Sequence, residues 1–570
     1  MLRDGIKAYN FPVVPGRFSR WRRAVRASVA GLAVACILFL SSATGTQAQA
    51  SAQDAIGAEG GHGRVLLVLP FDNRTGQPSL EWIREAAAEV LSTRFAAAGF
   101  EPTSRADRMY ALDHLGLPQG FQPSRASAIK LAQTLDADSI VVGSYTTDGT
   151  GIVAEATLVD VPELRMLPPV SARGEMRSLV AVFGDLAWKL TRQLDPTFNG
   201  SEETFAAEGN GVPLTAFEQY IRGITEPDQA ERLRHLQEAV KLSPGFGDAW
   251  MALGREDFNS QQYPEAAAAF AKVDHNAPDA LPSQQATNGL AGGPALEAGF
   301  YRGLSLMFQG DYAHAQEAFA DVARVLPLAE VVNDEGVALS RQGKDGTSEF
   351  IQAAAADPSA ADYHFNLAIS LKRHGNTAGA QNELAQCLKL RPSDIEAQTL
   401  ENAWKAPANA DANADPLERI ERSFNAAAFK QAAAMLDEMN AGRLAALPAG
   451  QRAQVLCSQA RGYLDRGLLL EAERLYQNAA EADARSAPAY AGLAEVRERS
   501  GDADAARKEA HESLELAPSA DAYVVLAKVD FAAGSLSDAS TEAEDAIKLD
   551  PQNRGAQEIL HNIAAKNGRR

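Results

Sequence analysis

Cysteine, aromatic residues and positive charge are all scarce in this chain of 570 residues. With only three cysteines in 570 residues, the fold cannot be one that disulfide bonds hold together. Aromatic residues make up 7% of the chain, and 74 acidic residues face 54 basic ones, for a net charge of −20. A protein that binds the phosphate backbone of nucleic acids needs a basic face, so this balance excludes a general nucleic-acid binder. With 46% hydrophobic residues, the chain can form several packed domains or a repeat array.

The motifs that carry common catalytic chemistry are also missing. The sequence contains no H-E-x-x-H, no G-x-S-x-G and no complete phosphate-binding loop. The nearest pair of histidines, His364 and His374, is ten residues apart, which does not place two metal ligands on one helical face. Gly343-Lys344 lacks the upstream glycine and the preceding strand of a phosphate loop, so we interpret it as a turn between helices. We therefore expect no enzyme activity, no cofactor and no metal site.

The first fifty residues have the order of a secretory signal. Seven cations and one acid precede residue 27, an apolar run spans Ala27–Leu40, and small and polar residues follow up to Ala48-Gln49-Ala50. As a helix the apolar run would extend about 21 Å, short of the roughly 30 Å hydrocarbon core of a membrane. We predict a signal peptide over 1–50 and a flexible lead-in over 51–63. Without residues 1–50 the net charge falls from −20 to −26.

Two alternatives to a cleaved signal stay open. The long basic segment is compatible with an uncleaved single membrane anchor. Cys36 allows lipidation, although the apolar run continues past it through Ile37–Leu40. Export to the periplasm or the envelope is the expectation in each case, with membrane association only through the N-terminus or through a partner.

Residues 64–196 predict a small α/β domain. Val65–Leu69 is a short continuous apolar run, typical of a strand that is buried on both faces. Two further apolar segments, 139–145 and 152–159, predict a hairpin around Asp148-Gly149-Thr150-Gly151. Apolar residues recur at helical spacing in three segments, 80–99, 124–135 and 179–194.

Short motifs in this region resemble the TolB N-terminal-like domain. They are Leu69-Pro70-Phe71-Asp72-Asn73, Leu80-Glu81-Trp82, Ala137-Asp138 with Ile140–Tyr145 after it, and Leu158-Val159-Asp160. The resemblance implies an α/β domain that contacts other proteins in the bacterial envelope and has no catalytic role. A regulator that binds a ligand or nucleotide within 64–196 is the less favoured alternative, because no phosphate loop follows the first strand.

Prolines recur at intervals near 34 residues through the rest of the chain. Similar residues stand 28, 25, 24, 12 and 8 positions before several of these prolines. The residues are Trp250, Leu253, Gly254, Ala266 and Phe270 before Pro278; Leu367 and Ala380 before Pro392; Tyr490, Leu493 and Ala506 before Pro518; and Tyr523, Leu526 and Ala539 before Pro551. The pattern resembles the tetratricopeptide repeat (TPR), with its W-x₂-L-G…A-x₃-F…P signature.

The resemblance implies pairs of helices stacked as a solenoid. Small residues allow the two helices of a unit to approach closely, and proline stops the second helix because it lacks an N–H. Since one unit cannot bury its apolar face alone, the units must stack. The predicted fold class is therefore an α+β N-terminal domain followed by an all-α solenoid. Cys387 and Cys457, in separate repeats, are expected to fill helix interfaces rather than to pair.

A low-complexity stretch divides the repeats into two blocks. We predict a first block over 213–402, an Ala/Asn/Asp/Pro linker over 403–416, and a second block over 417–570 with a C-terminal capping helix near 553–566. Two local predictions go with this division. An insertion near Leu281–Leu296 should form a loop, and Phe424 and Phe429 should belong to a degenerate opening unit of the second block.

Positions of the first helices that packing leaves unused should line a concave groove. These positions are Met251, Arg255, Phe258, Asn259, Phe365, Ile369, Lys372 and Arg373. Their apolar and basic side chains suit an extended peptide with apolar anchors and some acidity. The alternative is that Phe258, Phe365 and Ile369 pack between repeats while the charges only face solvent.

The sequence thus favours an exported, non-enzymatic scaffold that binds proteins or extended peptides through its repeats. The alternative function is an envelope-associated assembly or transport component that is anchored at its N-terminus. Neither function requires nucleic acid.

Limited proteolysis tests the division into blocks. We expect the first cut near 403–416, because exposed low-complexity linkers are the preferred sites of nicking. Mass spectrometry of the first fragments locates the cut. A first cut inside 230–280 would contradict the hinge.

Overall fold

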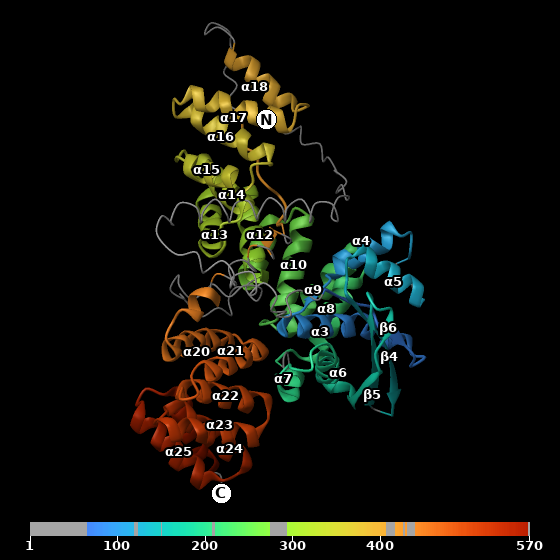
Figure 1. Ribbon diagram of the computed structural model, residues 1–570, viewed down its shortest axis with the longest axis vertical. Helices are drawn as coiled ribbons and strands as arrows, with labels where there is room; N and C mark the ends of the chain where they lie inside the picture. The colour runs from blue at the N-terminus through green and yellow to red at the C-terminus, as the bar shows by residue number, and fades with distance from the viewer. Residues whose placement is uncertain are drawn as a thin grey trace, which may run out of the picture. The chain divides into compact units, whose positions relative to one another are not determined.

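The structure is a computed structural model that describes residues 65–118, 124–149, 151–207, 211–273, 293–405, 416–425, 428–429, 432, 439 and 441–567. The predicted signal peptide and lead-in lie outside these residues, as do Pro278 and residues 406–415 of the predicted linker. A mixed α/β sheet region precedes a long series of paired helices, which is the predicted fold class (Figure 1). No described helix is both long and apolar enough to span a bilayer.

The sheet is built around strand β1 (Val65–Val68). This strand pairs in parallel with β3 (Glu101–Pro102) on one side and with β4 (Ser139–Asp148) on the other. Strand β4 forms the predicted antiparallel hairpin with β5 (Gly151–Asp160). Three short strands complete the sheet: β2 (Asp72–Asn73), β6 (Arg165–Met166) and β7 (Val170–Glu175).

Each face of the sheet has its own apolar core, so β1 is buried on both faces as predicted. Leu66 and Val68 belong to one core, and Leu67 and Leu69 belong to the other. Helices α3 (Ile83–Ala97) and α6 (Leu179–Leu194) supply the first core, and α4 (Arg105–His114) and α5 (Arg125–Thr134) supply the second. The sequence predicted α3, α5 and α6 but not α4. Its mostly polar sequence buries only Arg108, Ala111 and Leu112, which is too narrow an apolar face to detect.

The sheet region and the first repeat share a core. The cluster that contains Leu66 continues into Tyr220 and Ile221 of α8 (Leu214–Thr225) and Leu236 of α9 (Gln229–Leu242). The Tyr220 hydroxyl donates a hydrogen bond to Glu89 Oε1 on α3 at 3.0 Å. Burial raises the pKa of Glu89, which is consistent with a carboxyl that is enclosed at this junction.

The first repeat block consists of consecutive helix pairs, the arrangement of a TPR-type solenoid. After α8 and α9 come α10 (Gly247–Asn259), α11 (Tyr263–Val273), α12 (Gly293–Gln309), α13 (Tyr312–Val325), α14 (Ala329–Arg341), α15 (Thr347–Ala356), α16 (Ala361–Arg373), α17 (Thr377–Leu390) and α18 (Ile395–Lys405). Helix α12 begins inside the predicted loop 281–296, so residues 293–296 are helical rather than irregular. Residues 281–292 lie outside the described residues.

The second block has the same construction. Its helices are α20 (Ala449–Asp465), α21 (Leu469–Ala482), α22 (Ala487–Ser500), α23 (Ala503–Leu516), α24 (Ala520–Ala533), α25 (Leu536–Leu549) and α26 (Arg554–Asn567). Helix α26 corresponds to the predicted capping helix. Pro392, Pro518 and Pro551 each stand two residues beyond the end of a second helix, in agreement with the role expected of proline. Cys387 and Cys457 are buried and unpaired, as expected.

The small residues of the repeat signature make room for aromatic rings. A Cβ on Gly254 would lie 2.8 Å from the Phe270 ring, and one on Gly303 would lie 2.6 Å from the Phe319 ring. The Phe270 ring also stacks on Tyr301 of the next unit, with centroids 5.7 Å apart. Most signature side chains are buried: Leu253, Ala266, Phe270, Leu367, Ala380, Leu493, Ala506, Leu526 and Ala539. Trp250, Tyr490 and Tyr523 are only partly buried.

Residues 416–425 differ from the prediction that they open the second block. They form no helix, and the Phe424 ring contacts Phe300 of α12 with centroids 5.7 Å apart. Phe424 and Phe429 both pack in the apolar core of the first block. Helical spacing could not reveal this, because the two rings pack with residues of the first block that are far away in the sequence, such as Phe300.

A short helix that the sequence left unassigned contacts the second block. Helix α7 (Glu202–Ala207) packs against α21 and α22. Beside it, the Ser201 N–H donates to Glu473 Oε1 at 3.1 Å, and Arg497 forms an ion pair with Glu473 at 2.6 Å. The Phe205 carbonyl accepts a hydrogen bond from Arg94 of α3 at 3.0 Å. Helix α7 thus contacts both the α/β region and the second block.

Replacing Gly254 with alanine tests the close packing in the repeats. The added methyl group must displace the Phe270 ring, so we expect a loss of about 1–2 kcal/mol in unfolding free energy despite the better helix propensity of alanine. Gly462→Ala is the matched control, since nothing lies within 4 Å of a Cβ at that helical position. It should gain about 0.5–1 kcal/mol. Urea unfolding followed by circular dichroism measures both, and equal shifts would refute the packing role of Gly254.

Candidate functional site

A non-helical stretch of the chain itself packs against α14 and α16, two first helices of the first repeat block. We call residues Pro416–Asn425 the inserted segment, and we call the surface of the first block that contacts it the groove. Asn366 of α16 binds its backbone twice: Nδ2 donates to the Arg419 carbonyl at 2.7 Å, and Oδ1 accepts the Arg419 N–H at 2.7 Å. Asn333 of α14 donates to the same carbonyl at 3.1 Å. Because both contacts involve only the main chain, these asparagines hold an extended peptide whatever its side chain at this position.

Two carboxylates of α14 extend the main-chain contacts. The Glu421 N–H donates to Asp334 Oδ1 at 2.9 Å, and the Asn425 N–H donates to Glu330 Oε1 at 3.1 Å. Asp334 is fully buried and Glu330 is 5% exposed. Burial raises the pKa of both carboxyls. The inserted segment therefore satisfies polar groups that α14 would otherwise bury without these partners.

The Glu418 side chain lies in a basic part of the groove. Its carboxylate accepts a hydrogen bond from Ser340, forms an ion pair with Arg373, and lies 3.6 Å from Arg341. Arg373 also donates to the Pro416 carbonyl at 3.0 Å. The Glu418 side chain is only 1% exposed, so its charge is enclosed together with its partners.

The next residue, Arg419, lies among acidic side chains. Its guanidinium forms ion pairs with Asp394 at 2.6 Å, Asp362 at 2.7 Å and Glu396 at 2.9 Å. It also lies over the Phe365 ring, 3.6 Å from the centroid. Burial alone would raise the pKa values of Asp362 and Asp394, but hydrogen bonds from arginine outweigh it and hold both below the usual range.

The end of the inserted segment makes apolar and aromatic contacts. Ile420 and Phe424 pack against the core of the first block. The Arg422 guanidinium lies over the Phe308 ring, 5.2 Å from its centroid. Main-chain, charged and apolar contacts thus all occur within ten residues.

Two of the eight predicted groove residues, Phe365 and Arg373, contact the inserted segment directly. On the same helix, Ile369 is 2% exposed and packs in a core cluster, as the alternative interpretation had it. Lys372 lies over the Trp404 ring of α18, 5.5 Å from its centroid. Phe365 is fully buried, with Arg419 covering its ring.

The four predicted residues on α10 mostly contact the next unit. Met251 is buried and packs with Ala298 of α12. Phe258 packs between repeats, where its ring contacts those of Tyr263, Tyr301 and Phe308. Arg255 forms an ion pair with Glu297 of α12 at 2.5 Å, and Asn259 is exposed.

Sequence reasoning missed the residues that bind the backbone of the inserted segment, although one signal was present. Asn333 stands three residues before Gly336. The corresponding residues of two other repeats are apolar: Met251, three residues before Gly254, and Phe300, three residues before Gly303. An asparagine at a position that repeats normally bury requires a hydrogen-bonding partner. No comparable signal marked Glu418 and Arg419, because a charged pair beside a linker is ordinary in sequence.

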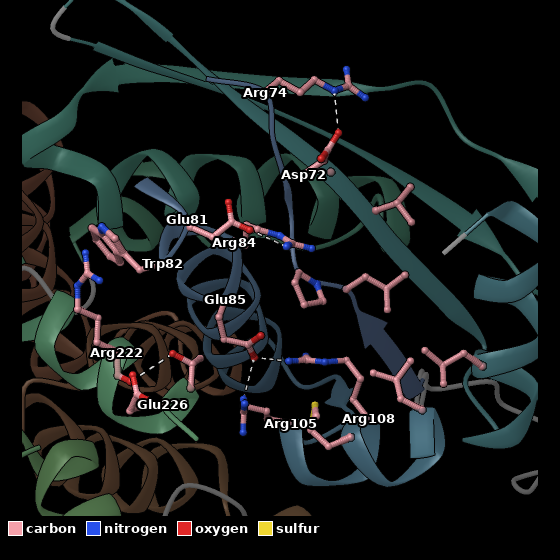
Figure 2. A pocket seen from close by; sticks show the side chains of 18 of the residues that line it. Asp72, Arg74, Glu81, Trp82, Arg84, Glu85, Arg105, Arg108, Arg222 and Glu226 are labelled. Carbon is pink, nitrogen blue, oxygen red and sulfur yellow. Dashed lines mark hydrogen bonds and ion pairs between the residues drawn. The ribbon is translucent and has the colours of Figure 1, made fainter. Parts of the chain in front are cut away.

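A second candidate site is a cavity of about 590 Å³ at the carboxyl end of β1. Figure 2 shows that charged side chains from α3, α4 and the first repeat line it. Five are arginines: Arg74, Arg84, Arg105, Arg108 and Arg222. Glu85 pairs with both Arg105 and Arg108, and Glu81 pairs with Arg84 at 2.7 Å. Carboxylates thus already compensate much of this positive charge. In the described part of the chain, no three His, Cys, Asp or Glu side chains gather in a way that could hold a metal ion.

Comparison with known proteins gives resemblances in fold only. No protein-family model matches the sequence, and no curated protein matches it significantly. Among solved structures, the TPR protein YrrB, described as having an unusual peptide-binding site, is 15% identical over 38% of this chain and 98% of its own, with a TM-score of 0.27. A tetratricopeptide repeat protein from Parabacteroides merdae is 11% identical over 56% of this chain and 98% of its own, with a TM-score of 0.24.

A third solved structure also resembles part of this chain. The C-terminal domain of LpoB from Salmonella enterica is 24% identical over 22% of this chain and 92% of its own, with a TM-score of 0.19. Because all three TM-scores are below 0.5, none of these proteins supports a statement about what this chain binds. The resemblance to the TolB N-terminal-like domain is not confirmed by any of them.

Acid should release the inserted segment, but only below about pH 4. Since the pKa values of Asp362 and Asp394 lie below the usual 3.8 in the folded protein, their ion pairs with Arg419 persist down to that pH and fail as the pH falls through the lowered values. A spin label on a Ser423→Cys variant, with Cys36 replaced by serine, reports the mobility of the segment. We expect a constant spectrum from pH 8 to pH 5 and motional narrowing below pH 4. Release between pH 7 and pH 5 would contradict the role of these carboxylates.

Proposed function

We propose that this chain is an exported, non-enzymatic scaffold that recognises other proteins through extended peptides bound in the groove of its first repeat block. One observation carries the proposal: buried polar side chains of α14 and α16 bind the main chain of a non-helical segment at Arg419 and Glu421. These main-chain hydrogen bonds suit any peptide that binds in the same conformation, because every residue except proline offers the same N–H and carbonyl.

Charged side chains on either side of these main-chain hydrogen bonds would make the groove selective for particular peptides. Arg341 and Arg373 favour a carboxylate, and Asp362 with Asp394 favours a guanidinium one residue later. These groups lie on α14, on α16 and at the start of α18, so neighbouring units combine to form the site. A catalytic role has no such support, because the groove contains hydrogen-bonding and ion-pairing groups rather than an activated nucleophile or a general base.

Export rests on the N-terminal sequence, which lies outside the described residues. A soluble periplasmic chain that starts near Ser51 is the proposed form, and an envelope-associated component held by an uncleaved N-terminus is the alternative. Cell fractionation with N-terminal sequencing distinguishes them. Recovery of the intact N-terminus in the membrane fraction would favour the anchored form.

The cavity at the end of β1 supports a second function less well. A ligand- or nucleotide-binding regulator would use its arginines, but Glu81 and Glu85 already engage three of them. Thermal-shift measurements of the full chain with nucleotides and sugars test this function, and a shift of several degrees would favour it.

Site-specific photocrosslinking tests the groove. A photoreactive amino acid in place of Lys372, beside Arg373, should crosslink to a partner in cells, whereas one at Lys389 should not. Lys389 is an exposed residue of α17, the second helix of the same unit, and serves as the matched control. Mass spectrometry should find the crosslinked partner peptide in an extended, non-helical region. Crosslinks at Lys389 alone would place recognition on another surface.

A further inference from the structure

We propose that the inserted segment is a tethered competitor for the groove, and that the external partner carries the same chemistry. That partner is an extended peptide in which an acidic residue is followed directly by arginine and then by an apolar residue. The inference rests on the proposed function, since it requires the groove to bind peptides. It adds the chemical identity of the peptide and the group that opposes its binding.

The order of the charges follows from how the groove is built. The carboxylate of Glu418 lies beside Arg373 and Ser340, at the C-terminal ends of α16 and α14. The guanidinium of Arg419 lies near Asp362, at the N-terminal end of α16, and near Asp394, which directly precedes α18. Exchanging the two residues would direct a carboxylate toward carboxylates and a guanidinium toward arginines. Because like charges held this closely repel each other, the groove distinguishes Glu-Arg from Arg-Glu.

The main-chain contacts set the register of the peptide. Asn366 binds both the N–H and the carbonyl of Arg419, and Asp334 accepts the N–H two residues later. Between them, Ile420 packs against the apolar core of the block. A partner with an apolar residue directly after the arginine would reproduce all of these contacts.

Competition follows because the segment is covalently joined to the repeats that form its site. Ten residues, 406–415, separate Pro416 from Lys405, the last residue of α18. A short tether of this kind gives an effective concentration in the millimolar range, which a free peptide must overcome. A peptide of the same chemistry replaces each contact that the segment gives up, so the tether is the main advantage of the segment.

Binding of a synthetic peptide to the full chain measures this competition. The probe is a fluorescein-labelled peptide with the sequence of residues 416–425. In the control peptide, only the residues that correspond to Glu418 and Arg419 are exchanged. The protein variants are the wild type, a Glu418→Ala/Arg419→Ala double variant, and that double variant with Asn366→Ala added. We expect the double variant to bind the probe at least tenfold more tightly than the wild type does, as measured by fluorescence anisotropy. Adding Asn366→Ala should abolish the gain.

The other outcomes distinguish the tethered competitor from the proposed function on which it rests, peptide recognition by the groove. Equal binding to the wild type and the double variant, lost on Asn366→Ala, would leave peptide recognition in place and overturn the tethered competitor. Equal binding of the control peptide would overturn the Glu-Arg order. No binding to a double variant that keeps the wild-type circular dichroism spectrum and melting temperature would overturn the function itself. A single Arg419→Gln variant, which preserves the size of the segment, provides the same comparison should the double variant unfold.

Discussion

Buried asparagines in a helical core, Asn333 and Asn366, impose the constraint on which the first repeat block depends. An amide that is buried without partners costs roughly 1–3 kcal/mol in protein mutational data. The backbone of Arg419 supplies partners to both asparagines. Asn366 Nδ2 also donates to Asn333 Oδ1 at 2.8 Å, so the two side chains belong to one network. The groove and the segment in it therefore stabilise each other.

The sequence predicted those parts of the structure that depend on local periodicity. The helix pairs, the buried strand β1 and the hairpin of β4 and β5 follow from apolar spacing and from the prolines after the second helices. It failed at residues 416–425, whose conformation depends on helices far away in the chain. Low-complexity neighbours suggested a hinge there, and Phe424 suggested a new repeat, yet its ring packs on Phe300. Of the candidate groove residues, Phe365 and Arg373 were identified because the repeat signature fixes which face of α16 is concave. The asparagines and carboxylates were missed because their roles require a partner that periodicity does not reveal.

Charge explains how a strongly acidic chain can hold a segment that is itself charged. Glu418 and Arg419 carry opposite charges, and the groove places arginines around the first and carboxylates around the second. The same local compensation occurs in the cavity at the end of β1, where Glu85 lies between Arg105 and Arg108. The net charge of the chain therefore says little about either site, and the arrangement of neighbouring charges determines what each can bind.

The apolar core that α3 and α8 share fixes the first repeat against the sheet region.

Hydrogen–deuterium exchange of residues 416–425 tests the central claim most directly. The amide of Arg419 is bound by Asn366 and that of Glu421 by Asp334, although neither lies in a helix or a strand. We expect peptic fragments that span these residues to exchange slowly in the wild-type chain and rapidly in an Asn366→Ala variant. Exchange at the rate of an unstructured peptide in the wild type would contradict the occupation of the groove.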